Sequence, residues 1–202
     1  SGLELVLPRG LHTNVPVTEE FVRSSPYVLR RDRHGLVLER DREPVARVRL
    51  APRPEWYGRR TASGKLMSRV GTLQGTYLGV YPGKVCEFWR GEDRSNCHFC
   101  SVGLNLGADD ASTKSVEDVA EVARAAVAES GVTYVDFNAG HDALEGFLGD
   151  VSRHATRVKE ETGALIGVQT PPHADLERYR ALRALGVNRV SFCFELFDPE
   201  RF

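Results

Sequence analysis

Apolar and polar positions follow two different patterns along this chain, and the second pattern begins near residue 71. Beyond that point, short apolar runs typical of buried strands alternate with stretches whose apolar residues recur every three or four positions, as in amphipathic helices. Ser115 and Asp118 resemble a capping box, and Gly131 fits the end of the same helix. The pattern predicts strands over 75–81, 132–137, 164–169 and 188–195, and helices over 115–130, 142–161 and 174–185.

The first seventy residues contain only short apolar runs. Three of them, 27–29, 36–40 and 45–50, are strand-like, and in the last run apolar residues alternate with Arg47 and Arg49. A period of two is typical of a half-buried strand. Polar turns separate the runs, so we expect a small antiparallel β-rich cap over residues 1–70 and a second domain over residues 71–202.

The alternation of strands and helices in residues 71–202 predicts the fold class. Regular βα alternation implies parallel strands joined by right-handed crossovers. The first turn lacks the glycine fingerprint of a nucleotide-binding sheet, which favours a barrel. We therefore expect an α/β fold, a partial (β/α)6 TIM-type barrel of which this chain contains the first four units. Because the chain stops directly after an apolar run, we expect that more chain follows Phe202 in the natural protein.

Charge and composition narrow the functional classes. The 202 residues carry 27 basic and 28 acidic side chains, a net charge of −1, which argues against a dedicated binder of nucleic acids or membrane surfaces. There is no membrane-spanning apolar run and no signal-peptide pattern, so we expect a cytoplasmic protein with reduced cysteines. Residues 30–60 hold ten arginines against five acidic residues. The overall balance favours a solvated sheet face there over a phosphate-contacting patch.

Three of the four cysteines share one polar loop, with the spacing C-x10-C-x2-C. They are Cys86, Cys97 and Cys100. In an intracellular protein a Cys-x-x-Cys pair on a loop indicates a metal site more often than a disulfide. Three thiolates can hold three irons of a [4Fe–4S] cluster and leave the fourth iron open to a small ligand. A zinc site completed by His98 or a distant residue is the alternative, and it would make the chain a non-catalytic zinc-stabilised module. An electron carrier is disfavoured because no fourth cysteine lies in the loop.

A strand, a loop with three cysteines ending in Cys97-His98-Phe99-Cys100, and alternating helices and strands together resemble the radical S-adenosylmethionine (radical SAM) superfamily. The stretch 62–103 looks like an uncharacterised, biotin-synthase-like subgroup of it. The family's usual spacing is C-x3-C-x2-C, whereas ten residues separate Cys86 from Cys97 here. An excursion of that length can close at modest entropic cost, and the chemistry requires only that three sulfurs converge.

The resemblance implies a set of cofactor-binding residues. The three cysteines would ligate the [4Fe–4S] cluster, and Phe99 would pack near the adenine of S-adenosylmethionine. The segment Asn138, Ala139 and Gly140, which lacks the usual Gly-Gly-Glu, corresponds to the motif that receives the methionyl amino group; a plain helix-entry turn is the alternative. Gln169 and Glu195 end the third and fourth strands and would contact the cofactor, unless Glu195 is a surface carboxylate.

The fourth cysteine and the partners complete the expectations. Cys193 shares strand parity with Ser191 and Glu195 and is expected to face the barrel interior. A small buried thiol is favoured there over a residue that lines a substrate cavity. By resemblance, the partners would be a small-molecule substrate and a one-electron donor such as flavodoxin or ferredoxin. The substrate itself is not encoded in any motif of this chain.

Overall fold

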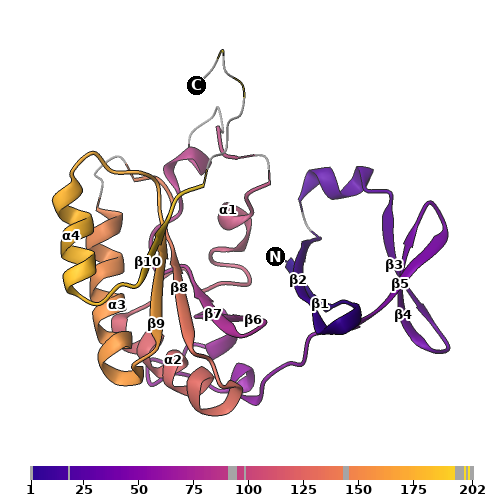
Figure 1. The fold of residues 1–202 in the computed structure, drawn as a ribbon, viewed down its shortest axis with the longest axis horizontal. Coiled ribbons are helices and arrows are strands. Elements are labelled where there is room, and N and C mark those ends of the chain that lie inside the picture. Colours follow the sequence, from indigo (N-terminus) through magenta and orange to yellow (C-terminus); the bar gives the residue numbers. More distant parts are fainter. Residues whose placement is uncertain are drawn as a thin grey trace. The chain divides into compact units, whose positions relative to one another are not determined.

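The computed structural model describes residues 2–17, 19–90, 95–97, 99–142, 146–193, 198 and 200. The chain forms two compact units, which Figure 1 shows as ribbons. The first comprises residues 1–53 together with 99–101, and the second comprises residues 54–98 and 102–202. The N-terminal stretch of the first unit thus ends at residue 53, earlier in the sequence than the predicted β-rich cap over residues 1–70.

The first unit contains a five-stranded antiparallel sheet. Its spatial order is β2-β1-β5-β4-β3, with β1 (Gly2–Val6), β2 (His12–Pro16), β3 (Tyr27–Asp32), β4 (Gly35–Arg40) and β5 (Glu43–Leu50). The three predicted strands are confirmed as β3, β4 and β5, whereas β1 and β2 were not predicted. The buried apolar residues of this sheet are Leu5, Val6, Val37 and Val48, each less than a tenth exposed.

The second unit is built on a mixed sheet in the order β10-β9-β8-β7-β6. Strands β7, β8, β9 and β10 are parallel neighbours, and β6 pairs antiparallel with β7 at the edge. The bounds are β6 (Thr72–Gln74), β7 (Tyr77–Val80), β8 (Tyr134–Asn138), β9 (Leu165–Gln169) and β10 (Arg189–Ser191). The four predicted strand positions therefore hold, although β7 is shorter than expected and β10 ends at Ser191, with Phe192 and Cys193 outside the strand.

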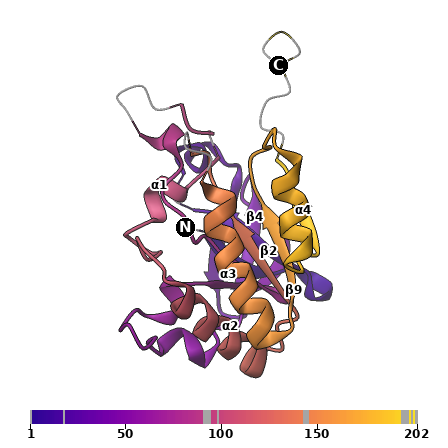
Figure 2. The same cartoon turned by 90° about the vertical axis from the view of Figure 1, so that its left-hand side faces the viewer.

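Among the described residues of this unit, four α-helices accompany the sheet: α1 (Val102–Asn105), α2 (Val116–Ser130), α3 (Phe147–Thr162) and α4 (Leu176–Ala184). The predicted capping box of α2 is present, since Ser115 and Asp118 exchange side-chain and backbone hydrogen bonds. Helix α3 begins five residues later than predicted, with Gly146 at its N-cap. Apolar residues of α2 and α3 pack with alternate residues of β7, β8 and β9 in one core. Figure 2 shows the ribbon of α3 in front of the sheet.

The prediction of a partial (β/α)6 barrel is wrong. The protein is a two-sheet α+β structure whose first sheet is wholly antiparallel, and within the described residues the second sheet is open. Gly75, with φ of +62°, turns the chain between β6 and β7 into a hairpin. The outer edge of β7, which a barrel would use for closure, is therefore occupied by β6. The apolar pattern locates strands but does not show whether the sheet closes into a barrel. Strand β6 has only three residues, too few for its alternation to be recognised in the sequence.

The segment that follows β5 in the sequence contacts both ends of α2. Trp56, on the 3-10 helix η3 (Glu55–Gly58), is fully buried in the core of the second unit. Its backbone N–H donates to Glu129 Oε1 at 3.0 Å, and its indole N–H donates to Ser130 Oγ at 3.1 Å. Arg59 pairs with Glu129 at 2.9 Å. Residues 54–61 therefore belong structurally to the second unit.

At the other end of α2, a buried carboxylate accepts hydrogen bonds from the same segment. Asp118, 1% exposed, accepts hydrogen bonds from Thr61 and Lys65, each at 2.7 Å, from Ser63, and from the backbone N–H of Ser115 at 2.9 Å. Burial raises the pKa of this carboxyl, but the hydrogen bonds from Lys65 and the hydroxyls outweigh it and hold the pKa well below its usual range. Asp118 is therefore ionised in the folded protein.

We expect Asp118→Asn to lower the free energy of unfolding by about 2 kcal/mol at pH 7, because charge-assisted hydrogen bonds are lost. A carboxyl whose pKa is depressed on folding stabilises the fold above its unfolded pKa of about 3.9, and this contribution disappears as the pH falls further. Urea unfolding at pH 7 and at decreasing pH below 4 should show the difference between parent and variant shrinking. Exposed Asp109→Asn is the control. A difference that does not change with pH would contradict the role of the charge.

Candidate functional site at the carboxyl edge of the second sheet

The candidate site lies where β7, β8 and β9 end. Because these strands are parallel, their carboxyl ends meet at one edge of the sheet. Asn138 pairs with Gln169 in register, and the backbone N–H of Ala139 donates to the Gln169 carbonyl at 2.9 Å. The loop that carries the cysteines leaves the same edge, directly after β7. The predicted residues 138–140 and Gln169 therefore lie at the edge from which the cysteine loop leaves the sheet.

A backbone hydrogen bond joins the two ends of the long segment between Cys86 and Cys97. The 3-10 helix η5 (Glu87–Trp89) starts the excursion, and the backbone N–H of Ser95 donates to the carbonyl of Phe88 at 3.2 Å. Phe88 lies two residues after the first cysteine, and Ser95 lies two residues before the second. The hydrogen bond thus returns the chain to its starting point and reduces the effective separation that the spacing of ten residues implies.

Trp89 of this excursion packs on Gly103, the second residue of α1. A Cβ at residue 103 would collide with the indole ring, so glycine is needed for this close approach. The contact joins the start of the excursion to the helix that follows Cys100. Nothing in the sequence pattern of residues 103–107 indicates this packing.

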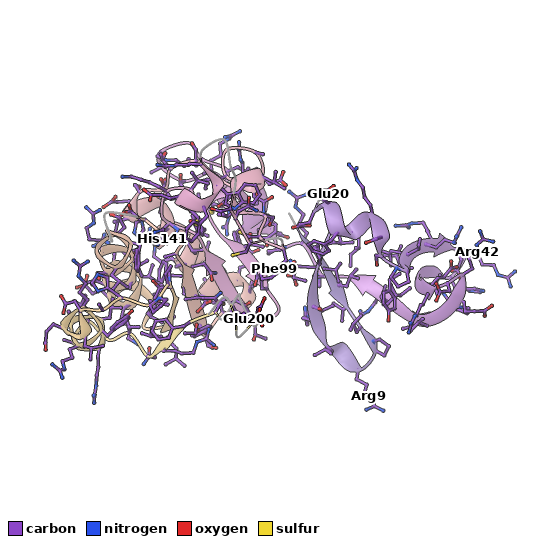
Figure 3. The ribbon with its side chains drawn as sticks, turned by 90° about the horizontal axis from the view of Figure 1, so that it is seen from above. Arg9, Glu20, Arg42, Phe99, His141 and Glu200 are labelled. Carbon is purple, nitrogen blue, oxygen red and sulfur yellow. The ribbon has the colours of Figure 1, made fainter. Side chains whose placement is uncertain are left out.

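The cysteine loop also lies directly against the loop that follows β8. A Cβ built on Gly140 would be 2.5 Å from Cys86 Cβ and 2.7 Å from Tyr81 Oη. The backbone N–H of Glu87 donates to the His141 carbonyl at 3.0 Å, and the rings of Phe88 and His141 stack with centroids 4.7 Å apart. His141 is labelled in Figure 3. Gly140 thus provides the space in which Cys86 sits.

A buried lysine fixes the base of the loop. Lys114 Nζ, whose side chain is 1% exposed, donates to the carbonyls of Tyr81 at 2.8 Å and Ala111 at 3.0 Å, and pairs with Asp110 at 2.8 Å. Burial lowers the pKa of Lys114, and burial likewise raises the pKa of Asp110. His154 of α3 contacts the Lys114 carbonyl at 3.3 Å. The sequence did not predict the role of Lys114, because a lysine just before an amphipathic helix gives no signal of burial.

The cysteines themselves are all thiols rather than disulfide partners. Cys86 and Cys97 belong to the second unit, and Cys100 lies in the segment grouped with the first, so the convergence of all three sulfurs stays a prediction from the sequence. Within the described part of the chain, no group of three or more His, Cys, Asp or Glu side chains is arranged to hold a metal ion. Thiolate ligands suit iron or zinc. The hydrogen bond from Ser95 to Phe88 and the packing of Cys86 on Gly140 are compatible with a loop that binds a metal.

The remaining predicted residues have different outcomes. Gln169 Nε2 contacts Cys193 Sγ at 2.8 Å, which joins the ends of the third and fourth parallel strands. Cys193 is exposed, so its interpretation as a small buried thiol is wrong: it lies beyond the end of β10 rather than within it. The ring of Phe99 is more than half exposed. His98 and Glu195 lie outside the described residues.

One polar cluster on the sheet was not predicted. Asp136 of β8, 5% exposed, accepts hydrogen bonds from Tyr134 Oη at 2.6 Å and from Arg189 Nη2 at 3.1 Å. The Tyr134 hydroxyl occupies the space that a side chain at Gly167 would need. Burial, and then the hydrogen bond to Asp136, raise the pKa of Tyr134. Alternation along β8 places Asp136 on the face opposite the helices, and this alternation is the sequence feature from which its position could have been predicted.

Comparisons of the chain with protein-family models, with curated proteins and with solved structures find no match. None of the described helices has the length and apolar character needed to cross a membrane. The site is therefore interpreted from its own residues.

Proposed function

We propose that the three-cysteine loop binds a [4Fe–4S] cluster and that the protein is a radical SAM enzyme acting on a small-molecule substrate. The observation that supports this most is the folding of the loop: its ten-residue excursion closes at Phe88 and Ser95 and packs Cys86 against Gly140. An enlarged spacing is thereby compatible with cysteines that act together. When bound, such a cluster supplies the electron that cleaves S-adenosylmethionine to methionine and a 5′-deoxyadenosyl radical, which abstracts hydrogen from the substrate.

Within this proposal, the chain's own residues hold and orient the two cofactors. The thiolates of Cys86, Cys97 and Cys100 would ligate three irons. The backbone at residues 138–140 would receive the methionyl amino group, at an edge that already brings Gly140 to Cys86. Gln169 and Glu195 would bind polar groups of S-adenosylmethionine, and Phe99 would cover its adenine. The hard chemistry then belongs to the cofactors, and the protein supplies position and exclusion of oxygen.

The partners follow from the same proposal. A one-electron donor such as flavodoxin or ferredoxin would reduce the cluster, and a reducing, cytoplasmic environment would keep the thiols available. The protein would not act on nucleic acid.

The test is anaerobic reconstitution of the full chain with iron and sulfide, followed by addition of dithionite and S-adenosylmethionine. We expect a brown protein with close to four irons and four sulfides per chain, and release of 5′-deoxyadenosine. A colourless protein that binds one zinc and no iron would contradict the proposal and would favour the zinc-stabilised module.

The packing of Cys86 on Gly140 provides a sharper structural prediction. Gly140→Ala places a methyl group where Cys86 and Tyr81 now lie, and the nearest backbone atom, Cys86 Cα, is only 3.1 Å from it. The cysteine loop must shift, so we expect the reconstituted iron content to fall to less than about half, with little change in thermal unfolding because the strain is confined to the loop. Iron and sulfide analysis provides the measurement.

The matched control for this substitution is Gly83→Ala in the same loop, where a new Cβ meets no atom within 4 Å. That variant should retain the parent's iron content. Equal iron content in both variants would show that the packing of Cys86 on Gly140 has no part in cluster binding.

A further inference from the structure

Tyr81 is the first residue after β7, and its side chain turns back on the cysteine loop that follows. The strand ends here because Pro82 has no backbone N–H with which to continue the ladder. The Tyr81 hydroxyl donates to the Lys84 carbonyl at 2.8 Å, across the bend at Gly83. This hydrogen bond fixes the direction in which the chain runs toward Cys86.

The same hydroxyl borders the place where Cys86 packs. A Cβ added at Gly140 would lie 2.7 Å from Tyr81 Oη and 2.5 Å from Cys86 Cβ, so both atoms border the same point of the backbone. The next residue is also held, because the backbone N–H of Glu87 donates to the His141 carbonyl at 3.0 Å. Tyr81 on one side and this hydrogen bond on the other therefore keep Cys86 against residues 140 and 141.

Lys114 joins the two ends of the segment that contains all three loop cysteines. Its Nζ donates to the carbonyl of Tyr81, which precedes the segment, at 2.8 Å. It also donates to the Ala111 carbonyl at 3.0 Å and pairs with Asp110 at 2.8 Å, after the segment. An ammonium group has three N–H donors, and these three acceptors use all of them. Because both ends of residues 82–109 are fixed, part of the entropy cost of ordering the loop is met within the chain.

We propose that Lys114 and Tyr81 are positioning residues, which hold the loop around Cys86 in its metal-binding conformation before any metal arrives. Neither side chain would touch the metal, and both act through the backbone that leads to Cys86. Many small metal sites become ordered only when the metal binds. Here hydrogen bonds within the chain order the loop instead. The proposal rests on the metal-binding function proposed for the loop, and it adds how the site is formed.

The test measures hydrogen exchange at the Glu87 amide in the metal-free full chain, since this amide donates to His141 and reports whether the loop is in place. Tyr81→Phe keeps the ring and removes only the hydroxyl. We expect exchange to become about three- to tenfold faster, the change in opening equilibrium expected for one hydrogen bond. Lys114→Met removes three hydrogen bonds at once, so its exchange should be at least about tenfold faster. The iron that a reconstituted chain retains against a chelator should fall in the same order.

Two variants are matched controls, because they remove the same chemical groups elsewhere in the second unit. Tyr134→Phe removes a hydroxyl that donates to Asp136 on the sheet. Lys159→Met removes an ammonium that donates to the Ala164 carbonyl at 3.0 Å, beyond the end of α3. We expect Lys159→Met to lower the thermal unfolding midpoint, as the loss of a purely structural lysine does. Both controls should nevertheless keep the parent's Glu87 exchange and iron retention.

Unchanged Glu87 exchange in Tyr81→Phe or in Lys114→Met would overturn the proposal for that residue. Faster exchange with the parent's iron retention would overturn it as well, since the held conformation would then have no part in metal binding. An equal acceleration in Tyr134→Phe or Lys159→Met would indicate a general loosening of the unit and would have the same consequence. A parent chain that takes up no iron would contradict the proposed function, and Glu87 exchange would still decide whether the two side chains hold the loop. If Lys114→Met does not fold, Tyr81→Phe decides alone.

Discussion

Replacing Cys97 by alanine is expected to abolish the iron–sulfur cluster and, with it, all cleavage of S-adenosylmethionine. A cluster with one open iron uses three thiolates, and removal of one leaves two, too few to retain it. Iron and sulfide per chain, the broad visible absorption and 5′-deoxyadenosine formation should all fall to background after anaerobic reconstitution. Cys86→Ala and Cys100→Ala should behave in the same way. The effect on thermal unfolding without the cluster should be small, because these thiols are only half-buried.

The matched control is Cys193→Ala. Cys193 is exposed and contacts Gln169, and it is not part of the three-cysteine loop. This variant should keep the parent's iron and sulfide content. Full iron content in Cys86→Ala would show that the cysteine at the long spacing is not a ligand, and retention of iron in all three loop variants would sink the proposed site altogether.

Local patterns in the sequence were sufficient to locate most elements of the second unit. Helix α2 begins within one residue of its predicted start, since Ser115 and Asp118 form the capping box and Gly131 ends the helix in a left-handed conformation. These signals are local: each depends on a few neighbouring residues and on the chemistry of a helix end. The end of α3 at Gly163 follows the same rule.

Features that depend on distant contacts were not accessible in this way. Residues 54–70 have no helical or strand period, yet Trp56 lies in the second unit's core because α2 supplies Glu129 and Ser130 as partners 73 and 74 residues later. The three-residue strand β6 forms only because β7 is there to pair with it. Closure of a sheet is a property of its two edges, so the barrel could not be inferred from four apolar runs.

The candidate site shows the same division. The identity of the three cysteines and their position after a strand could be taken from the sequence, because spacing and residue type are local. The contact of Cys86 with Gly140 joins residues 54 positions apart, and Lys114 reaches back to Tyr81 across 33 positions. These contacts exist because parallel strands end at a common edge, which is a tertiary property.

Trp56→Ala is expected to destabilise the second unit by about 3–5 kcal/mol, the range for removing a fully buried large aromatic side chain. Trp56 is 0% exposed, packs edge-on against Tyr57, and donates its indole N–H to Ser130. A loss of this size should lower the unfolding midpoint by roughly 10 °C. The four described α-helices all belong to the second unit, so the helical far-UV circular dichroism signal follows the unfolding of that unit.

Two controls separate packing from hydrogen bonding and from exposure. Trp56→Phe keeps most of the ring but removes the donor to Ser130, so it should cost only about 1–2 kcal/mol. Leu176→Ala, at a residue 63% exposed on α4, should change little. Hydrogen exchange then locates the effect: amides of α2 should lose protection in Trp56→Ala, while those of β3, β4 and β5 keep theirs. Loss of protection in β3–β5 with α2 unaffected would mean that residues 54–70 belong with the N-terminal sheet, and that the boundary at Arg53 is misplaced.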